Sequence, residues 1–269
     1  MKVSKSSSLF KQFEPWLDIA AILAWGFLLI HYWKTEKLYI LIHPRYFGLT
    51  IGAGISLLIL GSCKTLELLY NISKNRQRSR QSKSEISTVQ NQQHINFFPP
   101  GWSSMLLLIS AVLALTITPQ VFASQTALQR GLTESLPVTR VQPQEFGRAK
   151  KPEERSLIEW IRTLNVYPEP DAYNDQKVNV TGFVLYPIGL SDQYFWISRF
   201  ILTCCAADAY PVGLPVKLPA SKNRSNYPQD SWLKIEGKMI TDELNGQRKL
   251  TIFPDKIEPI SRPKNPYDY

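Results

Sequence analysis

Three stretches of apolar residues lie in the first half of the chain, with polar segments between them. The first covers residues 16–33, has tryptophan at both ends and carries one acid, Asp18. The second covers residues 46–63 and the third residues 102–122. A helix of eighteen residues is about 27 Å long, close to the roughly 30 Å of the hydrocarbon core of a bilayer. The pattern therefore predicts three transmembrane helices with a lipid bilayer around them.

The pattern changes after the third apolar stretch. Residues 123–151 are polar and are expected to form a linker. Residues 152–164 begin with a proline and two acids and then place Leu157, Trp160 and Ile161 at helical spacing, which predicts a short amphipathic helix.

Apolar and polar residues then alternate with a period of two, which is typical of β-strands. Turn-forming residues separate five predicted strands, over residues 177–185, 194–203, 215–218, 232–240 and 249–253. Gly182 is expected to bend the first strand so that it serves two sheets, and Pro254 to end the fifth. This pattern favours a five-stranded barrel of the oligonucleotide/oligosaccharide-binding (OB) type, with a small sandwich as the alternative. The predicted fold class is thus an α+β membrane protein, with three N-terminal transmembrane helices and a small all-β domain over residues 152–269.

The net charge of +9 is unevenly distributed. Residues 1–122 carry twelve Lys and Arg against five Asp and Glu, whereas residues 123–269 carry nineteen against seventeen. Much of the excess lies at residues 71–98, an Asn-, Gln- and Ser-rich stretch that is expected to be a disordered loop. Beside membrane spans, such a basic loop favours the cytoplasmic side. A multi-pass protein of the cell inner (plasma) membrane follows, with an extracytoplasmic C-terminal domain and no nucleic-acid partner.

Two of the three cysteines are adjacent. Cys204 and Cys205 follow the second predicted strand, and Asp208 comes three residues later. Neighbouring residues of a strand point to opposite faces, so both thiols can reach one ion only if a turn intervenes, and residues 206–209 could supply it. The third cysteine, Cys63, is expected to be a small buried apolar residue.

Four interpretations of the cysteine pair remain open from the residues alone. Thiolates with Asp208 could bind a soft metal ion such as zinc. A strained disulfide between the two cysteines could take part in thiol exchange. A nucleophilic thiol would need a base, and residues 152–269 contain no histidine, so we expect no enzyme. The pair could also be structural, and no local His or second Cys pair is present to complete a four-ligand site.

Two other features lie near the pair in the sequence. Arg199 could pair with Asp208 or face a ligand, although a surface or salt-bridging arginine is the more general expectation. The segment Asn265–Tyr269 is aromatic and rigid and could dock on the barrel, although a frayed end is the default for such a tail.

Several of these residues together resemble a known family. They are Gly182-Phe-Val, the run Ser198-Arg-Phe-Ile-Leu-Thr-Cys-Cys-Ala-Ala-Asp-Ala209, Trp232-Leu-Lys-Ile-Glu-Gly237 and Asn265-Pro-Tyr-Asp-Tyr269. The chain is similar, over nearly its whole length, to the YcgQ-like family of two-component permease subunits, whose C-terminal region is classed as a domain of unknown function. The resemblance implies a membrane location and a larger polytopic permease subunit as partner. It supplies no catalytic residues.

The sequence therefore predicts an accessory subunit of a two-component membrane permease. Its ligand or metal candidates are Cys204, Cys205, Asp208 and Arg199, which would handle a soft metal ion or a thiol-reactive solute. The alternative is a membrane-anchored thiol redox or assembly factor with a redox or structural cysteine pair.

Overall fold

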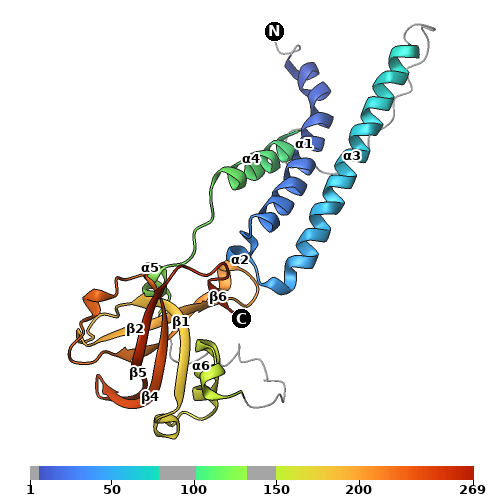
Figure 1. The fold of residues 1–269 in the computed structure, drawn as a ribbon. Helices are drawn as coiled ribbons and strands as arrows, with labels where there is room; N and C mark the ends of the chain where they lie inside the picture. Colours follow the sequence, from blue (N-terminus) through green and yellow to red (C-terminus); the bar gives the residue numbers. More distant parts are fainter. Residues whose placement is uncertain (1–5, 79–100, 132–149) are drawn as a thin grey trace. The chain divides into compact units, whose positions relative to one another are not determined.

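The computed structural model describes residues 6–78, 101–131 and 150–269, which fall into two compact units (Figure 1). We call these the helical unit, with residues up to Leu38 and Pro44–Pro119, and the sheet unit, with Tyr39–His43 and Gln120–Tyr269. The short segment Tyr39–His43 thus belongs to the sheet unit, although it lies between two helices of the other unit in the sequence.

The described part of the helical unit contains α1 (Ser6–Lys34), α3 (Phe47–Arg78) and α4 (Trp102–Thr116). Two stretches, Phe13–Lys34 and Pro44–Lys74, are long and apolar enough to cross a membrane. They contain the first two predicted spans.

Helix boundaries differ from the prediction at three places. α1 begins at Ser6, ten residues before the predicted start at residue 16. The third helix ends at Thr116 instead of residue 122, so it is about 22 Å long. Pro119 disfavours a helix at the residues before it, and β-branched residues precede the proline. α3 continues to Arg78, eight residues into the expected loop, because Lys, Arg and Gln are good helix formers and extend a helix that has already begun. The rest of that loop, residues 79–98, lies outside the described residues.

α1 packs against both other helices of its unit. A Cβ atom added at Gly26 of α1 would meet Leu58 of α3 at 2.9 Å, so this glycine allows the two helices to approach closely. The indole of Trp25 donates a hydrogen bond of 3.0 Å to the carbonyl of Leu107, and the hydroxyl of Tyr32 donates to the carbonyl of Ala114. Trp25 precedes Tyr32 in α1, and their partners Leu107 and Ala114 follow one another in the same order in α4. α4 therefore runs beside α1 in the same direction.

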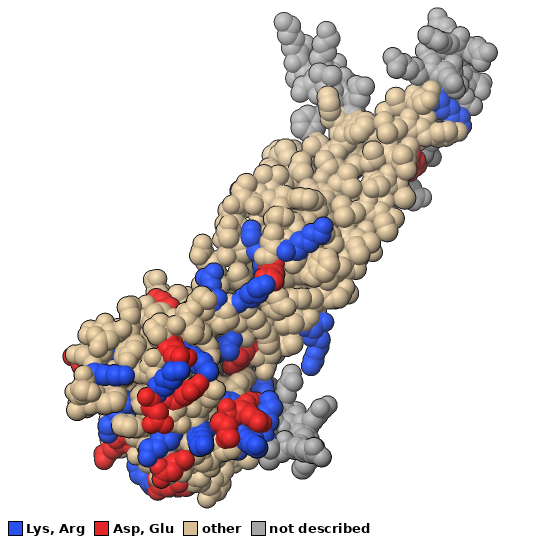
Figure 2. All heavy atoms as spheres, viewed as in Figure 1, with Lys and Arg blue, Asp and Glu red and all other residues tan. Residues whose placement is uncertain are grey.

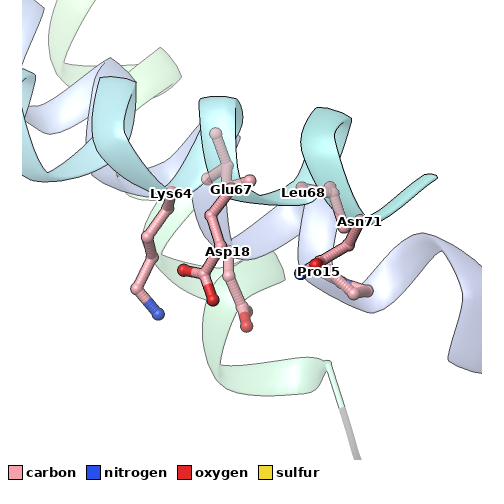
Figure 3. Close-up of a pocket in the computed structure, with 7 residues that line it drawn as sticks. Pro15, Asp18, Lys64, Glu67, Leu68 and Asn71 are labelled. Carbon is pink, nitrogen blue, oxygen red and sulfur yellow. The ribbon is translucent and has the colours of Figure 1, made fainter. Parts of the chain in front are cut away.

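A pocket opens between α1 and α3 at the polar end of these helices (Figure 3). Asp18 at this pocket also accepts a hydrogen bond from the hydroxyl of Ser104 on α4. Asp18 therefore connects two helices of the unit. The pocket is lined by Pro15, Asp18, Ile19, Lys64, Glu67, Leu68 and Asn71.

The sheet unit contains a six-stranded mixed sheet. Its strands are β1 (Lys177–Leu185), β2 (Tyr194–Ile201), β3 (Tyr210–Lys217), β4 (Trp232–Leu244), β5 (Gln247–Ile260) and β6 (Tyr267–Asp268). Their order is β1-β4-β5-β3-β2-β6, and β1 also pairs with β2. The β3–β5 and β2–β6 pairs are parallel and the others antiparallel. Each of the strands β1 to β5 therefore pairs with two others of this set.

Two glycines of this sheet lie where strands approach closely or change register. β1 shows an unbroken register with β4 at Gly182, so no bulge lies there, and from Phe183 onwards it pairs with β2. A Cβ at Gly182 would meet the carbonyl of Ser198 at 2.6 Å. Gly182 thus lets β1 and β2 come close. A bulge lies instead opposite Glu236 and Gly237 of β4, where Asp255 is one extra residue in β5, and β5 continues past Pro254, where the strand was expected to end.

A short helix, α6 (Leu157–Val166), confirms the amphipathic helix of the prediction. The hydroxyl of Ser156 accepts from the backbone N–H of Glu159, and the Glu159 carboxylate accepts from the N–H of Ser156. This capping box satisfies backbone donors that a helix start otherwise leaves unpaired.

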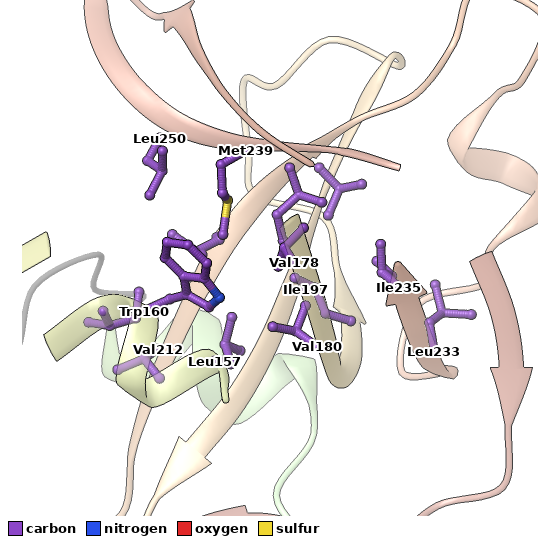
Figure 4. Packing of buried hydrophobic residues seen from close by; sticks show 14 of the residues in the cluster. Leu157, Trp160, Val178, Val180, Ile197, Val212, Leu233, Ile235, Met239 and Leu250 are labelled. Carbon is purple, nitrogen blue, oxygen red and sulfur yellow. The ribbon is translucent and has the colours of Figure 1, made fainter. Parts of the chain in front are cut away.

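The apolar face of α6 packs on the main core cluster (Figure 4). Trp160 is fully buried there, and its ring lies edge-on to that of Tyr173, with ring centroids 6.2 Å apart. Figure 4 shows side chains of α6 and of several strands meeting in this cluster. They include Leu157, Val178, Val180, Ile197, Val212, Leu233, Ile235, Met239 and Leu250.

A second buried cluster lies under α5 (Ser124–Arg130) and the C-terminal strand. Ala127 of α5 and Tyr267 of β6 are buried with Phe200 of β2. Part of the expected linker is therefore helical and packed, because it covers apolar side chains of the strands. Residues 132–149 of that linker lie outside the described residues.

Asp242 connects three strands. Its carboxylate accepts a hydrogen bond of 2.7 Å from the hydroxyl of Tyr194 and lies 2.9 Å from the Nζ of Lys217. Burial acts to raise the pKa of Asp242, but the hydrogen bonds from Lys217 and Tyr194 outweigh it and lower this pKa. The charged carboxylate thus stabilises the fold.

Charges on the two units differ. In Figure 2 blue and red side chains intermingle over the sheet unit, whereas the visible face of the helices is mostly uncharged. The mixed signs fit the near-balance of residues 123–269 and give no single-sign patch on the face shown.

Candidate functional site

The adjacent cysteines lie in the loop between β2 and β3. A 3₁₀ turn over Ala206–Asp208 follows them, which is the turn that the sequence required. The Asp208 carboxylate accepts hydrogen bonds from the backbone N–H of Cys204, at 2.9 Å, and of Cys205, at 3.3 Å. Asp208 thus folds back over the two cysteines.

This turn brings three potential ligands together. The sulfur atoms of Cys204 and Cys205 and a carboxylate oxygen of Asp208 all lie within 4.8 Å of one another. Cys204 is exposed, and the other two are partly buried, so a solute can reach the group. Within the described residues, it is the one set of three His, Cys, Asp or Glu side chains with this spacing.

The protonation states of Cys204 and Asp208 follow from the hydrogen bonds that these two residues make. The hydrogen bond to Asp208, and then that to Cys205, raises the pKa of Cys204 to about 11. Partial burial opposes ionisation of Asp208, but bonds from the Cys204 thiol and nearby backbone N–H groups lower the pKa of this carboxyl. At neutral pH the group therefore holds a thiol at Cys204 and a carboxylate at Asp208.

The segment Tyr39–His43 packs on the same loop within the sheet unit. Ile42 and Cys205 form an antiparallel bridge, and the N–H of His43 donates to the carbonyl of Cys204 at 3.0 Å. The His43 ring lies edge-on to the Tyr269 ring, with centroids 4.5 Å apart. Sequence reasoning missed this neighbour, because no local pattern links residues more than 150 positions apart.

Arg199 has a structural role in the C-terminal tail. Its guanidinium lies 2.9 Å from the Asp268 carboxylate and donates to the carbonyls of Asn265 and Tyr267, at 3.1 and 3.2 Å. Side chains of the ion pair are only 15% and 12% exposed. Burial raises the pKa of Asp268, and the nearby charge of Arg199 opposes that shift. Arg199 is thus the salt-bridging residue that was the general expectation.

The C-terminal tail contains an ordered strand, β6, whereas a frayed end was the general expectation for this segment. β6 pairs with β2 in parallel, through Phe200 with Tyr267 and Ile201 with Asp268. The N–H of Leu202 adds a bond of 3.0 Å to the carbonyl of Asp268. Since the cysteine loop starts just after Leu202, the tail holds the beginning of that loop.

Cys63 differs from the pair and from its prediction. It is exposed on α3 of the helical unit, where a buried position was expected, because α3 packs only part of its surface within that unit. The three cysteines are not joined by disulfide bonds in the structure.

The fold and the site define a protein with long apolar helices and a β-sheet unit that carries a thiol-containing loop. Residues 152–269 match the family model described as the DUF1980 C-terminal domain, and the match includes the cysteine loop. No curated protein matches the chain. Among solved structures, "OBody NL8 bound to hen egg-white lysozyme" is 19% identical, with a TM-score of 0.23, and the match covers 32% of this chain and 97% of that chain.

Proposed function

We propose that the chain is a membrane-anchored accessory subunit of a two-component permease, and that its β domain binds a soft metal ion through Cys204, Cys205 and Asp208. The observation that carries the proposal is the convergence of two sulfurs and a carboxylate oxygen within 4.8 Å on one accessible loop.

The donor set fits a soft or borderline ion such as Zn²⁺. Thiolate sulfur binds zinc at about 2.3 Å and carboxylate oxygen at about 2.0–2.2 Å, so tetrahedral ligand atoms are roughly 3.5–3.8 Å apart. The present spacing of up to 4.8 Å requires the side chains to close by about 1 Å. A bound metal replaces the thiol protons, which go to solvent, and this makes its affinity depend on pH.

The thiol chemistry disfavours a redox role at neutral pH. Thiol exchange uses the thiolate, and a pKa of about 11 keeps Cys204 protonated at neutral pH. A metal ion must displace the same proton, so the raised pKa of Cys204 also makes the metal affinity increase with pH. A redox or assembly factor remains the competing function, and the titration described below distinguishes it.

The fold of the sheet unit is proposed to be an OB-like barrel. The pairings β1-β2-β3-β5-β4 return to β1, with β3 and β5 parallel. A five-stranded Greek-key barrel needs such a closed cycle. In this arrangement the cysteine loop is the connection between the second and third strands.

We propose that α1, α3 and α4 all cross the inner (plasma) membrane. Apolar side chains such as Leu49 and Leu66 of α3 and Leu113 of α4 are at least half exposed in the helical unit, as lipid-facing residues would be. α4 runs in the same direction as α1, so three crossings would carry the chain outward after the cytoplasmic basic loop. The short α4 would need the extended residues after Thr116 or local bilayer thinning to complete its crossing.

The resemblance to the permease family supports a polytopic partner. Three helices are too few to enclose a transport path, so a larger subunit would provide it. The β domain would then deliver or sense the solute outside the cytoplasm.

Zinc titration of the full chain in detergent tests the site. The wild type and Cys63→Ser are expected to bind one Zn²⁺ per chain in competition with a chromophoric chelator. Cys204→Ser/Cys205→Ser should bind more than about 100-fold more weakly, because two ligands are lost. Equal binding by all three proteins, or none by the wild type, would overturn the metal site. A reversible disulfide detected by thiol alkylation and mass analysis would favour the redox function.

A C-terminal reporter tests the topology, and co-purification tests the partner. The reporter should be active only outside the cytoplasm, and an intact β domain should retain a polytopic membrane protein during purification. A cytoplasmic reporter signal would contradict the three-span arrangement.

A further inference from the structure

The chain has three histidines, and one of them belongs to the sheet unit through the segment Tyr39–His43. His31 lies on α1, and the third lies outside the described residues. His43 is therefore the described histidine that shares a unit with the cysteine loop.

The backbone register sets His43 opposite Cys204. Ile42 and Cys205 form an antiparallel bridge. His43, which follows Ile42, therefore lies opposite Cys204, which precedes Cys205. The bond of 3.0 Å from the His43 N–H to the Cys204 carbonyl agrees with this pairing. Directly opposed residues of antiparallel strands point to the same face, with Cβ atoms about 4.5–5.5 Å apart. His43 and Cys204 thus start from neighbouring backbone positions, and the imidazole lies outside the 4.8 Å group in the present side-chain arrangement.

Histidine is the ligand type that the cysteine group lacks. Zinc binds imidazole nitrogen at about 2.0–2.1 Å, and sites with two cysteines commonly take nitrogen ligands to reach four-coordination. The His43 ring rests edge-on against Tyr269. Rotation about its two side-chain bonds can turn a ring nitrogen from that contact towards the cysteine side, because the backbone is already in place.

We propose that His43 is the fourth ligand of the metal site, so that Cys204, Cys205, Asp208 and His43 hold one divalent soft cation such as Zn²⁺. This inference rests on the proposed metal-binding function. The cation bonds to both sulfurs, the thiol protons pass to solvent, and neutral imidazole donates a lone pair without any redox change. Binding ties Tyr39–His43, which joins α1 to α3 in the sequence, to the β domain.

The test uses Co²⁺ as a spectroscopic probe of the full chain in detergent. His43→Phe keeps an aromatic ring near Tyr269 but removes the nitrogen ligand. His31→Phe is the matched control, because the His31 ring also stacks on an aromatic side chain, that of Phe27, with centroids 5.7 Å apart. We expect His43→Phe to weaken Co²⁺ binding at least about tenfold and to shift its visible ligand-field bands. The sulfur-to-cobalt charge-transfer band should persist in both variants.

The outcomes distinguish a failure of the His43 assignment from a failure of the proposed metal-binding function. Wild-type affinity and bands in His43→Phe, with binding lost in the double cysteine variant, would overturn the His43 assignment and leave the metal site in place. Absence of Co²⁺ and Zn²⁺ binding in the wild type would overturn both.

A second measurement is made on the wild-type chain and uses the variant only to assign one signal. In wild-type chain labelled with ¹⁵N-histidine, Zn²⁺ should shift the imidazole nitrogens of one histidine, assigned to His43 by its absence from the His43→Phe spectrum. Unchanged signals in a zinc-loaded protein would overturn the proposal.

Discussion

Removal of the Arg199 guanidinium should release the C-terminal strand and the cysteine loop that follows β2. In Arg199→Ala the Asp268 carboxylate loses its ion-pair partner while it remains mostly buried. The tail also loses the bonds to the carbonyls of Asn265 and Tyr267. Breaking a buried pair from one side costs about 3–5 kcal/mol. Because these side chains keep 12–15% exposure and Asp268 can take up a proton, we expect about 3 kcal/mol, at the lower end of that range.

Hydrogen exchange measured by mass spectrometry can follow this loss in the full chain. A destabilisation of about 3 kcal/mol should speed amide exchange in peptides of β2 and β6 by roughly 150-fold if these strands open only by unfolding of the sheet unit. Peptides of α1 serve as an internal reference. Arg199→Met/Asp268→Leu, which removes both charges, should recover most of the protection. An acceleration of less than about fivefold in Arg199→Ala would refute the view that this ion pair holds the tail.

Two further predictions concern the sheet unit. Trp160→Ala should destabilise it by about 3–5 kcal/mol in urea unfolding, because the indole is fully buried, whereas Val166→Ala, at a residue 78% exposed, should change little. The folded-state pKa of Asp242 lies below its ordinary value of 3.8, so its contribution is present above pH 4 and is lost as the pH falls through and below that value. Asp242→Asn should therefore lower stability at pH 7 and flatten the acid limb of the stability curve, and an unchanged acid limb would contradict this assignment.

The strands that follow simple alternation could be predicted from the sequence. β1 has the predicted bounds, Lys177–Leu185, and β4 begins at the predicted Trp232, because alternate residues of these segments are buried over much of their length. Local rules failed for β3, which begins at Tyr210, five residues before the predicted start at residue 215, although this stretch contains Pro211 and Gly213. Proline is tolerated where its missing N–H is not needed for the ladder, and that depends on the neighbouring strand.

The candidate site was only partly predictable. Two adjacent cysteines and an aspartate three residues later identify a candidate ligand group, and residues 206–209 were named as a stretch that could supply the turn that unites them. His43 could not be found in this way, and docking of the tail was only one of two possibilities, because both places depend on long-range backbone pairing with the residues around Cys204. Arg199 was among the ligand candidates because of its proximity in sequence, but the tail provides its partner Asp268.

X-ray absorption of the zinc-loaded wild-type chain tests the central claim most directly. The account predicts two sulfur neighbours at about 2.3 Å and two lighter ligand atoms at about 2.0–2.2 Å from one zinc ion. A zinc ion surrounded only by nitrogen and oxygen would contradict a metal site built on Cys204 and Cys205.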